Sequence, residues 1–212
     1  MSSFTAADGA GVVRDLIDAV HQNRQYLSDI DGEIGDGDHG INMNKGFTLC
    51  GDELDNNTYD FSGSLLCLSK TLITKIGGAM GPLYGTMFRS MGKTVADKEY
   101  VDGALFGEML EAAVAGIRGI SKADVGDKTL VDVLVPAESA YRAALSKDKS
   151  FSAALDAMAA AARTGRDSTK ELVSKIGRSS RLGERSKGVI DAGAASCCLI
   201  LETMADSIKK RL

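Results

Sequence analysis

Apolar side chains recur three or four residues apart along almost the whole chain, and this spacing constrains the fold more than any other feature. It is the period of an amphipathic α-helix with one buried face. Only two prolines occur among 212 residues, and no stretch alternates apolar and polar side chains as a half-buried strand does. One proline, Pro136, is expected to kink its helix. The spacing predicts eight helices, within or beginning at residues 13–27, 43–54, 65–76, 84–91, 105–117, 130–141, 151 onward and 193–208.

The chain shows no composition break, internal repeat or long linker. Its length is enough to bury a large core. A single all-α domain over residues 1–212, with about eight antiparallel helices, is therefore the simplest architecture for this pattern.

Charge and cysteine content narrow the range of functions. The net charge is −4, which gives nucleic acid no electrostatic attraction. No apolar run reaches membrane-spanning length, and the first residues lack the pattern of a signal peptide. The four cysteines lack the spacing of a zinc site and are typical of a reducing compartment. We therefore expect a cytoplasmic protein with neither a nucleic acid nor a membrane as partner.

Three carboxylates are crowded into one glycine-rich stretch. Asp31, Asp36 and Asp38 cannot share one helical face, because successive residues are about 100° apart around a helix. A glycine-rich loop can turn all three toward one point, where the like charges need a cation. Oxygen ligands of this kind suit Mg²⁺, Ca²⁺ or Mn²⁺. The simpler alternative is a solvated acidic turn, since Asp-Gly pairs are common in turns.

Three further connections, residues 77–82, 126–129 and 177–193, are rich in glycine and polar side chains. In an up-and-down helical array alternate connections lie at the same end, so all three are expected beside the acidic stretch. Gly77-Gly78 and the following helix favour an anion, because backbone N–H groups and a helix N-terminus face it. The 126–129 connection also opens a helix, with Thr129 as an N-cap or a phosphate ligand.

The last connection contains Arg178, Arg181 and Arg185, whose guanidinium groups can bind phosphate bidentately. Carboxylates for a hard cation, two backbone anion sites and arginines together predict a Mg²⁺-nucleotide site. Other phosphate and metal motifs are excluded. The motif G-x-x-x-x-G-K-[ST] is absent, and an EF-hand loop beginning at Asp36 would have Phe47 where its last carboxylate is required.

Four motifs in order carry a resemblance to a known family. They are G-D-G-D-H-G-I-N-M at 35–43, G-G-A-M-G-P-L at 77–83, G-D-K-T at 126–129 and L-G-E-R-S at 182–186. Together they resemble the nucleotide-binding L subunit of dihydroxyacetone kinase across nearly the whole chain. The resemblance implies an eight-helix antiparallel up-and-down barrel that holds ADP or ATP at one end through two Mg²⁺ ions.

The same matching implies which residues form the site. Asp31, Asp36 and Asp38 are the implied metal ligands. The implied nucleotide contacts are His39, Gly40, Ile41, Asn42, Ala79, Met80, Ser121, Leu130, Arg178, Asp191, Ala192 and Gly193.

Three positions depart from the family pattern. Met80 stands where the family usually has serine, so a hydroxyl contact to phosphate is replaced by the backbone amide alone. Ser121 stands where a glycine is usual, which makes a close backbone approach less available. Ala192 replaces the proline of the usual Asp-Pro-Gly, which loosens one φ angle.

The resemblance predicts a phosphotransferase subunit that presents a Mg²⁺-bound nucleotide to dihydroxyacetone or a similar ketose held by a separate substrate-binding kinase subunit. Arg178 is the predicted catalytic residue and would stabilise the transferring phosphoryl group. The donor is either free ATP or a bound ADP that a phosphocarrier protein of the sugar phosphotransferase system rephosphorylates. Three alternatives stay open: a kinase subunit for another ketose such as a tetrulose, a nucleotide-sensing regulatory module without turnover, and a helical scaffold.

Overall fold

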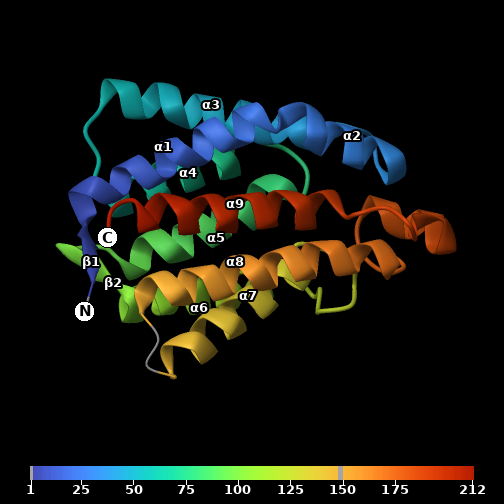
Figure 1. The fold of residues 1–212 in the computed structure, drawn as a ribbon. Coiled ribbons are helices and arrows are strands. Elements are labelled where there is room, and N and C mark those ends of the chain that lie inside the picture. The colour runs from blue at the N-terminus through green and yellow to red at the C-terminus, as the bar shows by residue number, and fades with distance from the viewer. Residues whose placement is uncertain (1, 148–149) are drawn as a thin grey trace.

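The helices run up and down along one common direction, as Figure 1 shows. The computed structural model describes residues 2–147 and 150–212, and the all-α class predicted from the apolar spacing is confirmed. The elements within these residues are, in chain order, β1 (Ser3–Thr5), α1 (Ala6–Gln22), α2 (Arg24–Ile34), α3 (His39–Asn56), α4 (Phe61–Lys75), α5 (Met80–Thr94), β2 (Tyr100–Asp102), α6 (Gly103–Ile120), α7 (Val131–Leu145), α8 (Phe151–Ser168), the 3-10 helices η1 (Thr169–Glu171) and η2 (Arg178–Ser186), and α9 (Ala192–Lys209).

The packing order follows the chain and closes on itself. α3 lies against α1 and α4, and each later α-helix packs against the one before it as far as α9. α9 then packs against α1, which closes the ring. The result is the expected up-and-down barrel, with α2 continuing from one end of α1 (Figure 1).

The first predicted helix is two helices. α1 ends at Gln22, and the backbone N–H and side-chain amide of Asn23 both donate to the Ala19 carbonyl. α2 begins at the next residue, so the described residues contain nine α-helices where eight were predicted. α2 extends to Ile34 and therefore includes Asp31, which was expected on a loop.

Two short strands are present that the apolar pattern did not predict. β1 and β2 pair antiparallel, with Phe4 opposite Val101 and both side chains buried. Each strand has three residues, which is too short for alternation to be recognised in a sequence. Each strand of this β-ribbon leads directly into a helix. Thr5, the last residue of β1, caps α1, and Asp102, the last residue of β2, caps α6.

The apolar faces of the helices meet inside the barrel. Leu16, Phe47, Leu68, Phe88 and Tyr141 come from five different helices, and each is fully buried. Burial of such side chains contributes about 1.5–3 kcal/mol each and is the main stabilising term for the ring. Among the described residues, none of the helices has both the length and the apolar content needed to cross a bilayer.

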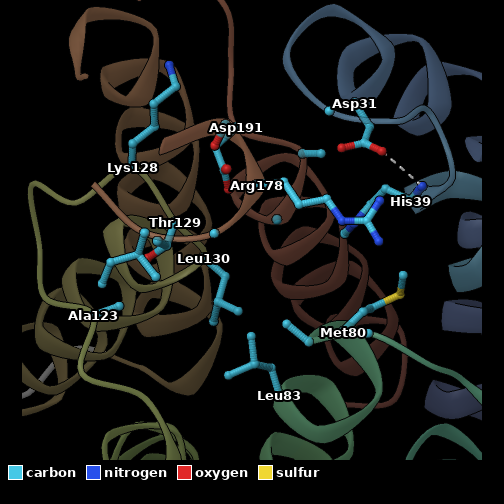
Figure 2. A pocket seen from close by; sticks show the side chains of 18 of the residues that line it. Asp31, His39, Met80, Leu83, Ala123, Lys128, Thr129, Leu130, Arg178 and Asp191 are labelled. Atoms are coloured by element: carbon cyan, nitrogen blue, oxygen red, sulfur yellow. Dashed lines mark hydrogen bonds between the residues drawn. The ribbon is translucent and has the colours of Figure 1, made fainter. Parts of the chain in front are cut away.

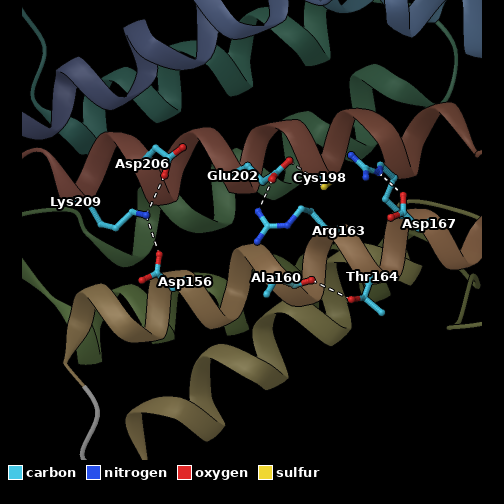
Figure 3. Close-up of polar contacts among 10 residues, drawn as sticks. Asp156, Ala160, Arg163, Thr164, Asp167, Cys198, Glu202, Asp206 and Lys209 are labelled. Atoms are coloured by element: carbon cyan, nitrogen blue, oxygen red, sulfur yellow. Dashed lines mark hydrogen bonds and ion pairs between the residues drawn. The ribbon is translucent and has the colours of Figure 1, made fainter.

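Polar contacts on the outside of the barrel contribute less. Across the seam between α8 and α9, Arg163 pairs with Glu202 at 2.6 Å and Lys209 pairs with Asp156 at 2.8 Å (Figure 3). Pairs of this exposed kind are worth about 0–1 kcal/mol. The seam is therefore held mainly by its buried apolar side chains.

Candidate functional site

A pocket of about 430 Å³ opens at the end of the barrel away from the β-ribbon. All four polar connections that were predicted to share one end contribute residues to it. Figure 2 shows Leu83, Ala123 and Leu130 on one side of the pocket. Asp31 and the guanidinium group of Arg178 lie on the other side (Figure 2). The pocket is therefore lined by both apolar and charged side chains.

The three aspartates predicted to be metal ligands lie together. Asp31 is in the last turn of α2, and Asp36 and Asp38 lie in the acidic turn, residues Gly35–Asp38, that leads into α3. Each offers a carboxylate oxygen within 4.8 Å of those of the other two. The reversal depends on Gly37, whose φ of 74° is disfavoured for other residues. A set of clustered, negatively charged oxygen atoms fits a hard divalent cation such as Mg²⁺.

Arg178 reaches the same cluster from the far end of the sequence. It is the first residue of η2 and follows Gly177, which has a φ of 82°. Its guanidinium group forms an ion pair with Asp36. Arg181 and Arg185 are exposed and do not line the pocket, so of the three arginines expected there the structure brings in Arg178 alone.

Helix α5 begins at the pocket. Its N-cap residue, Ala79, is followed by Met80, and no side chain caps the first N–H groups of the helix. Uncapped N–H groups at a helix N-terminus favour an anion. The Met80 side chain is partly buried against the apolar core, so the backbone is the polar group that this position presents.

The lysine loop, residues Gly126–Leu130, uses its polar groups internally. Asp132 is buried in the first turn of α7 and accepts hydrogen bonds from the Gly126 N–H at 2.6 Å and the Thr129 N–H at 2.7 Å. The Thr129 hydroxyl accepts from the Val131 N–H at 3.1 Å. A carboxylate of the following helix therefore already occupies two of the N–H groups expected to face an anion, and a second anion site at this loop stays a prediction.

A polar network behind the pocket was missed by the sequence analysis. The Ser196 hydroxyl lies 2.8 Å from His39 Nε2 and 2.6 Å from the Tyr84 hydroxyl, which also donates to the Gly193 carbonyl at 2.9 Å. Burial lowers the pKa of His39 to about 4, against the opposing effect of Asp31. The network joins α3, α5 and α9 at the base of the pocket. No sequence spacing signals it, because 112 residues separate Tyr84 from Ser196.

Asp191 holds the start of α9 at the pocket wall. Its carboxylate accepts a hydrogen bond from the Ala194 N–H at 2.8 Å, and its own N–H donates to the Thr169 hydroxyl at 3.1 Å. Burial raises the pKa of Asp191 to about 6. Ala192 and Gly193 follow in the first turn of α9 and also line the pocket.

Two predicted nucleotide contacts do not line the pocket. Gly40 is buried where α3 meets α2, and a Cβ atom there would lie 2.0 Å from the Arg24 carbonyl oxygen. Ile41 is 50% exposed. For the other predicted positions, contact with a nucleotide stays a prediction. Those that line the pocket are His39, Asn42, Ala79, Met80, Ser121, Leu130, Arg178, Asp191, Ala192 and Gly193.

The chain is similar to several known proteins. The chain matches the family model of the DAK2 domain over residues 33–206. It is 38% identical over 193 residues to the ADP-binding subunit DhaL of PEP-dependent dihydroxyacetone kinase 1 from Listeria innocua, which covers 91% of this chain and 91% of that protein. It is 37% identical over 190 residues to the ADP-binding subunit DhaL of the PTS-dependent dihydroxyacetone kinase from Lactococcus lactis, with 89% and 91% coverage.

A solved structure extends the likeness to the fold. The dihydroxyacetone kinase from C. freundii, in complex with AMP-PNP and Mg²⁺, superposes with a TM-score of 0.72 at 22% sequence identity. The match covers 93% of this chain and 33% of that one, so the chain spans about a third of that structure. At this identity the likeness shows a shared fold.

Proposed function

The chain belongs to the DAK2-domain family, and on that premise we propose that it is the nucleotide-binding subunit of a ketose kinase. It would hold ADP or ATP with Mg²⁺ and pass a phosphoryl group to dihydroxyacetone, or a similar small ketose, bound by a partner subunit. The two similar DhaL proteins support this proposal, because both are named ADP-binding subunits and the chain covers about nine tenths of each.

One observation carries the proposal more than any other. The same pocket combines a three-carboxylate cluster and an uncapped helix start with an apolar wall. A nucleotide has matching parts, since its phosphates take a divalent cation and N–H donors while its base takes an apolar surface. A plain acidic turn or a helical scaffold gives no reason for these three features to converge.

The roles of the residues follow from their places. Asp31, Asp36 and Asp38 would hold the two Mg²⁺ ions, which offset charge on the phosphate oxygens when bound. The first N–H groups of α5 would face a phosphate. Arg178 would move from its pair with Asp36 to the transferring phosphoryl group, where a guanidinium group stabilises negative charge. Transfer would then rest mainly on positioning and charge.

The partner and the donor belong to the same proposal. A separate subunit would bring the ketose, consistent with the word subunit in the names of both relatives. The words PEP-dependent and PTS-dependent in those names favour a bound ADP that a phosphocarrier protein rephosphorylates. Free ATP as the donor is the competing variant. Both variants suit the cytoplasm.

Binding is tested first. The purified chain is heated with ADP, with Mg²⁺, and with both, and its unfolding temperature is recorded. We expect a rise of several degrees only when both are present, because a ligand that binds the folded state stabilises it. No Mg²⁺-dependent shift would sink the proposal. Dialysis then separates the donors, since retention of one ADP per chain favours the coenzyme role.

Transfer is tested with the partner subunit, ATP, and a panel that contains dihydroxyacetone and a tetrulose. Phosphorylation of either ketose identifies the substrate class. A regulatory module that binds nucleotide without turnover is the second candidate, and the observation that favours it is the missing hydroxyl at Met80. Binding without any phosphorylated product would favour that module.

A further inference from the structure

Lys128 is a buried lysine in the wall of the pocket, and the mechanism above gives it no role. Its side chain is 0% exposed, and its backbone has a φ of 63°. Figure 2 shows its amine directed away from the centre of the pocket. The ammonium group donates to the Thr169 carbonyl at 2.6 Å and to the Val189 carbonyl at 2.5 Å. It is therefore directed at backbone and not at a ligand.

The surroundings of this ammonium group make its placement costly. Within residues 2–147 and 150–212, no carboxylate lies within 4.0 Å of the Lys128 nitrogen. Burial lowers the pKa of Lys128, while the charges of Asp191, Asp132 and Glu171 act in the opposite direction. A lysine buried without an ion-pair partner loses its hydration, which costs free energy. A structural role for its two carbonyl contacts would explain why this cost is borne.

Those two carbonyls lie at the two ends of one segment. Between Thr169 and Val189 the chain forms only short 3-10 turns and irregular structure, and it carries Arg178 near its middle. Two more contacts join the ends of the segment, which we call its neck. They run from the Gly188 N–H to the Lys170 carbonyl at 2.7 Å and from the Asp191 N–H to the Thr169 hydroxyl. Lys128 therefore links both ends of the segment to the lysine loop.

We infer that Lys128 is a positioning residue that closes the neck of the 169–189 segment and thereby holds Arg178 over the acidic turn. The part that concerns Arg178 and nucleotide rests on the proposed function. The part that concerns the neck rests on the two carbonyl contacts alone. The two parts have separate tests.

The neck is tested by hydrogen–deuterium exchange on the full chain without ligand. Lys128→Met keeps an apolar side chain of similar length and removes both donors. We expect at least fivefold faster exchange at Ser174, Lys175 and Gly188, whose N–H groups are hydrogen-bonded within or next to the segment. The matched control is Lys170→Met, which removes an exposed lysine from the same segment and is expected to leave these rates within twofold.

Helices α1 and α4 serve as internal references, and their exchange is expected to be unchanged in both variants. Equal acceleration throughout the chain, or no acceleration in the segment, overturns the inference. If Lys128→Met does not fold, Lys128→Gln keeps one polar donor and is measured by the same criteria, with acceleration confined to the segment again as the expected result.

Arg178 is tested by a double-mutant cycle, with Mg²⁺·ADP binding measured by calorimetry. We expect Lys128→Met to weaken binding about tenfold in the unmodified chain and less than twofold in an Arg178→Gln background, because residues that act through one another are not additive. Calorimetry reports the folded fraction as stoichiometry, separately from affinity. Equal weakening in both backgrounds overturns the link to Arg178. If the unmodified chain binds no Mg²⁺·ADP, the proposed function fails while the exchange result still decides the neck.

Discussion

The acidic turn and the lysine loop have similar compositions but use their polar groups in opposite ways. Both combine glycine with aspartate just before a helix, and both line the same pocket. In the acidic region the carboxylates of Asp31, Asp36 and Asp38 converge on each other. In the lysine loop the polar groups are hydrogen-bonded within the chain. Asp132 accepts hydrogen bonds from two N–H groups of the loop, and Lys128 donates to two distant carbonyls.

The difference separates a binding surface from a structural one. A group that binds a ligand keeps charge that its own chain compensates only in part. Asp36 pairs with the exposed Arg178 and Asp31 accepts from the His39 N–H at 3.3 Å, while the three clustered carboxylates still repel one another. A group that holds the fold together is compensated in the folded state. We therefore expect substitutions in the acidic turn to affect ligand binding, and substitutions around the lysine loop to affect folding.

The largest effect is expected from Asp36→Ala. Removing one of three clustered carboxylates should weaken Mg²⁺·ADP binding by about 100-fold, or about 2.7 kcal/mol, because it removes both a ligand atom and a charge. Calorimetry in the presence of Mg²⁺ measures this loss. The control is Asp29→Ala, an exposed aspartate on α2 whose side chain accepts from Gln25, and it is expected to keep the affinity within twofold. Unchanged binding by Asp36→Ala would refute the metal assignment.

Asp132→Ala is expected to lower stability, where Asp36→Ala lowers ligand affinity. It leaves the Gly126 and Thr129 N–H groups without their carboxylate and should lower the free energy of unfolding by about 2 kcal/mol. Urea unfolding without ligand measures this loss. Asp124→Ala removes an exposed aspartate from the connection before α7 and is expected to cost less than about 0.5 kcal/mol. Equal costs for the two variants would remove the distinction between the loops.

The fold was largely predictable because the helical period is a local signal. Leu65, Leu68 and Leu72 lie on one face of α4 whatever the rest of the chain does, and all three are buried. The break at Asn23 was not predictable, because the apolar spacing continues from Val20 into α2. The two strands are paired across nearly a hundred residues and are each three residues long, so they leave no periodic trace.

The site was predictable only where its parts are close in sequence. The convergence of three aspartates follows from their crowding into eight residues and from Gly37, which permits the reversal. Whether an N–H group faces a ligand or a neighbouring carboxylate is a matter of geometry, and Asp132 gives no sign of it in the sequence. The contacts of Lys128 reach across 41 and 61 residues and leave no pattern to recognise.

Asp191 lies between the acidic turn and the lysine loop, and it tests whether a residue of the pocket wall can affect stability. Burial raises its folded pKa to about 6 from an ordinary value of 3.8, so its ionisation opposes folding. This cost is absent at low pH, grows between about pH 4 and pH 6, and is complete above that range. Asp191→Asn keeps an N-cap side chain and should stabilise the protein by on the order of 1 kcal/mol at pH 7.

Urea unfolding at pH 4 and pH 7, without ligand, checks this prediction. The advantage of Asp191→Asn over the unmodified chain is expected to be small at pH 4 and present at pH 7. An advantage that is equal at both pH values would mean that the Asp191 carboxylate titrates no differently in the folded and unfolded states, and would contradict the prediction.

The smallest effect is expected from Tyr84→Phe, which probes the network that joins the helices behind both regions. The substitution removes the hydroxyl that contacts Ser196 and the Gly193 carbonyl, while Ser196 stays within reach of His39 and still donates to that carbonyl. Because these groups keep other partners, the loss should be about 1 kcal/mol of unfolding free energy, with Mg²⁺·ADP affinity within twofold. A tenfold loss of affinity without loss of stability would instead assign the network to ligand binding. These buried hydrogen bonds would then belong with the acidic turn, where substitutions are expected to affect binding and not folding.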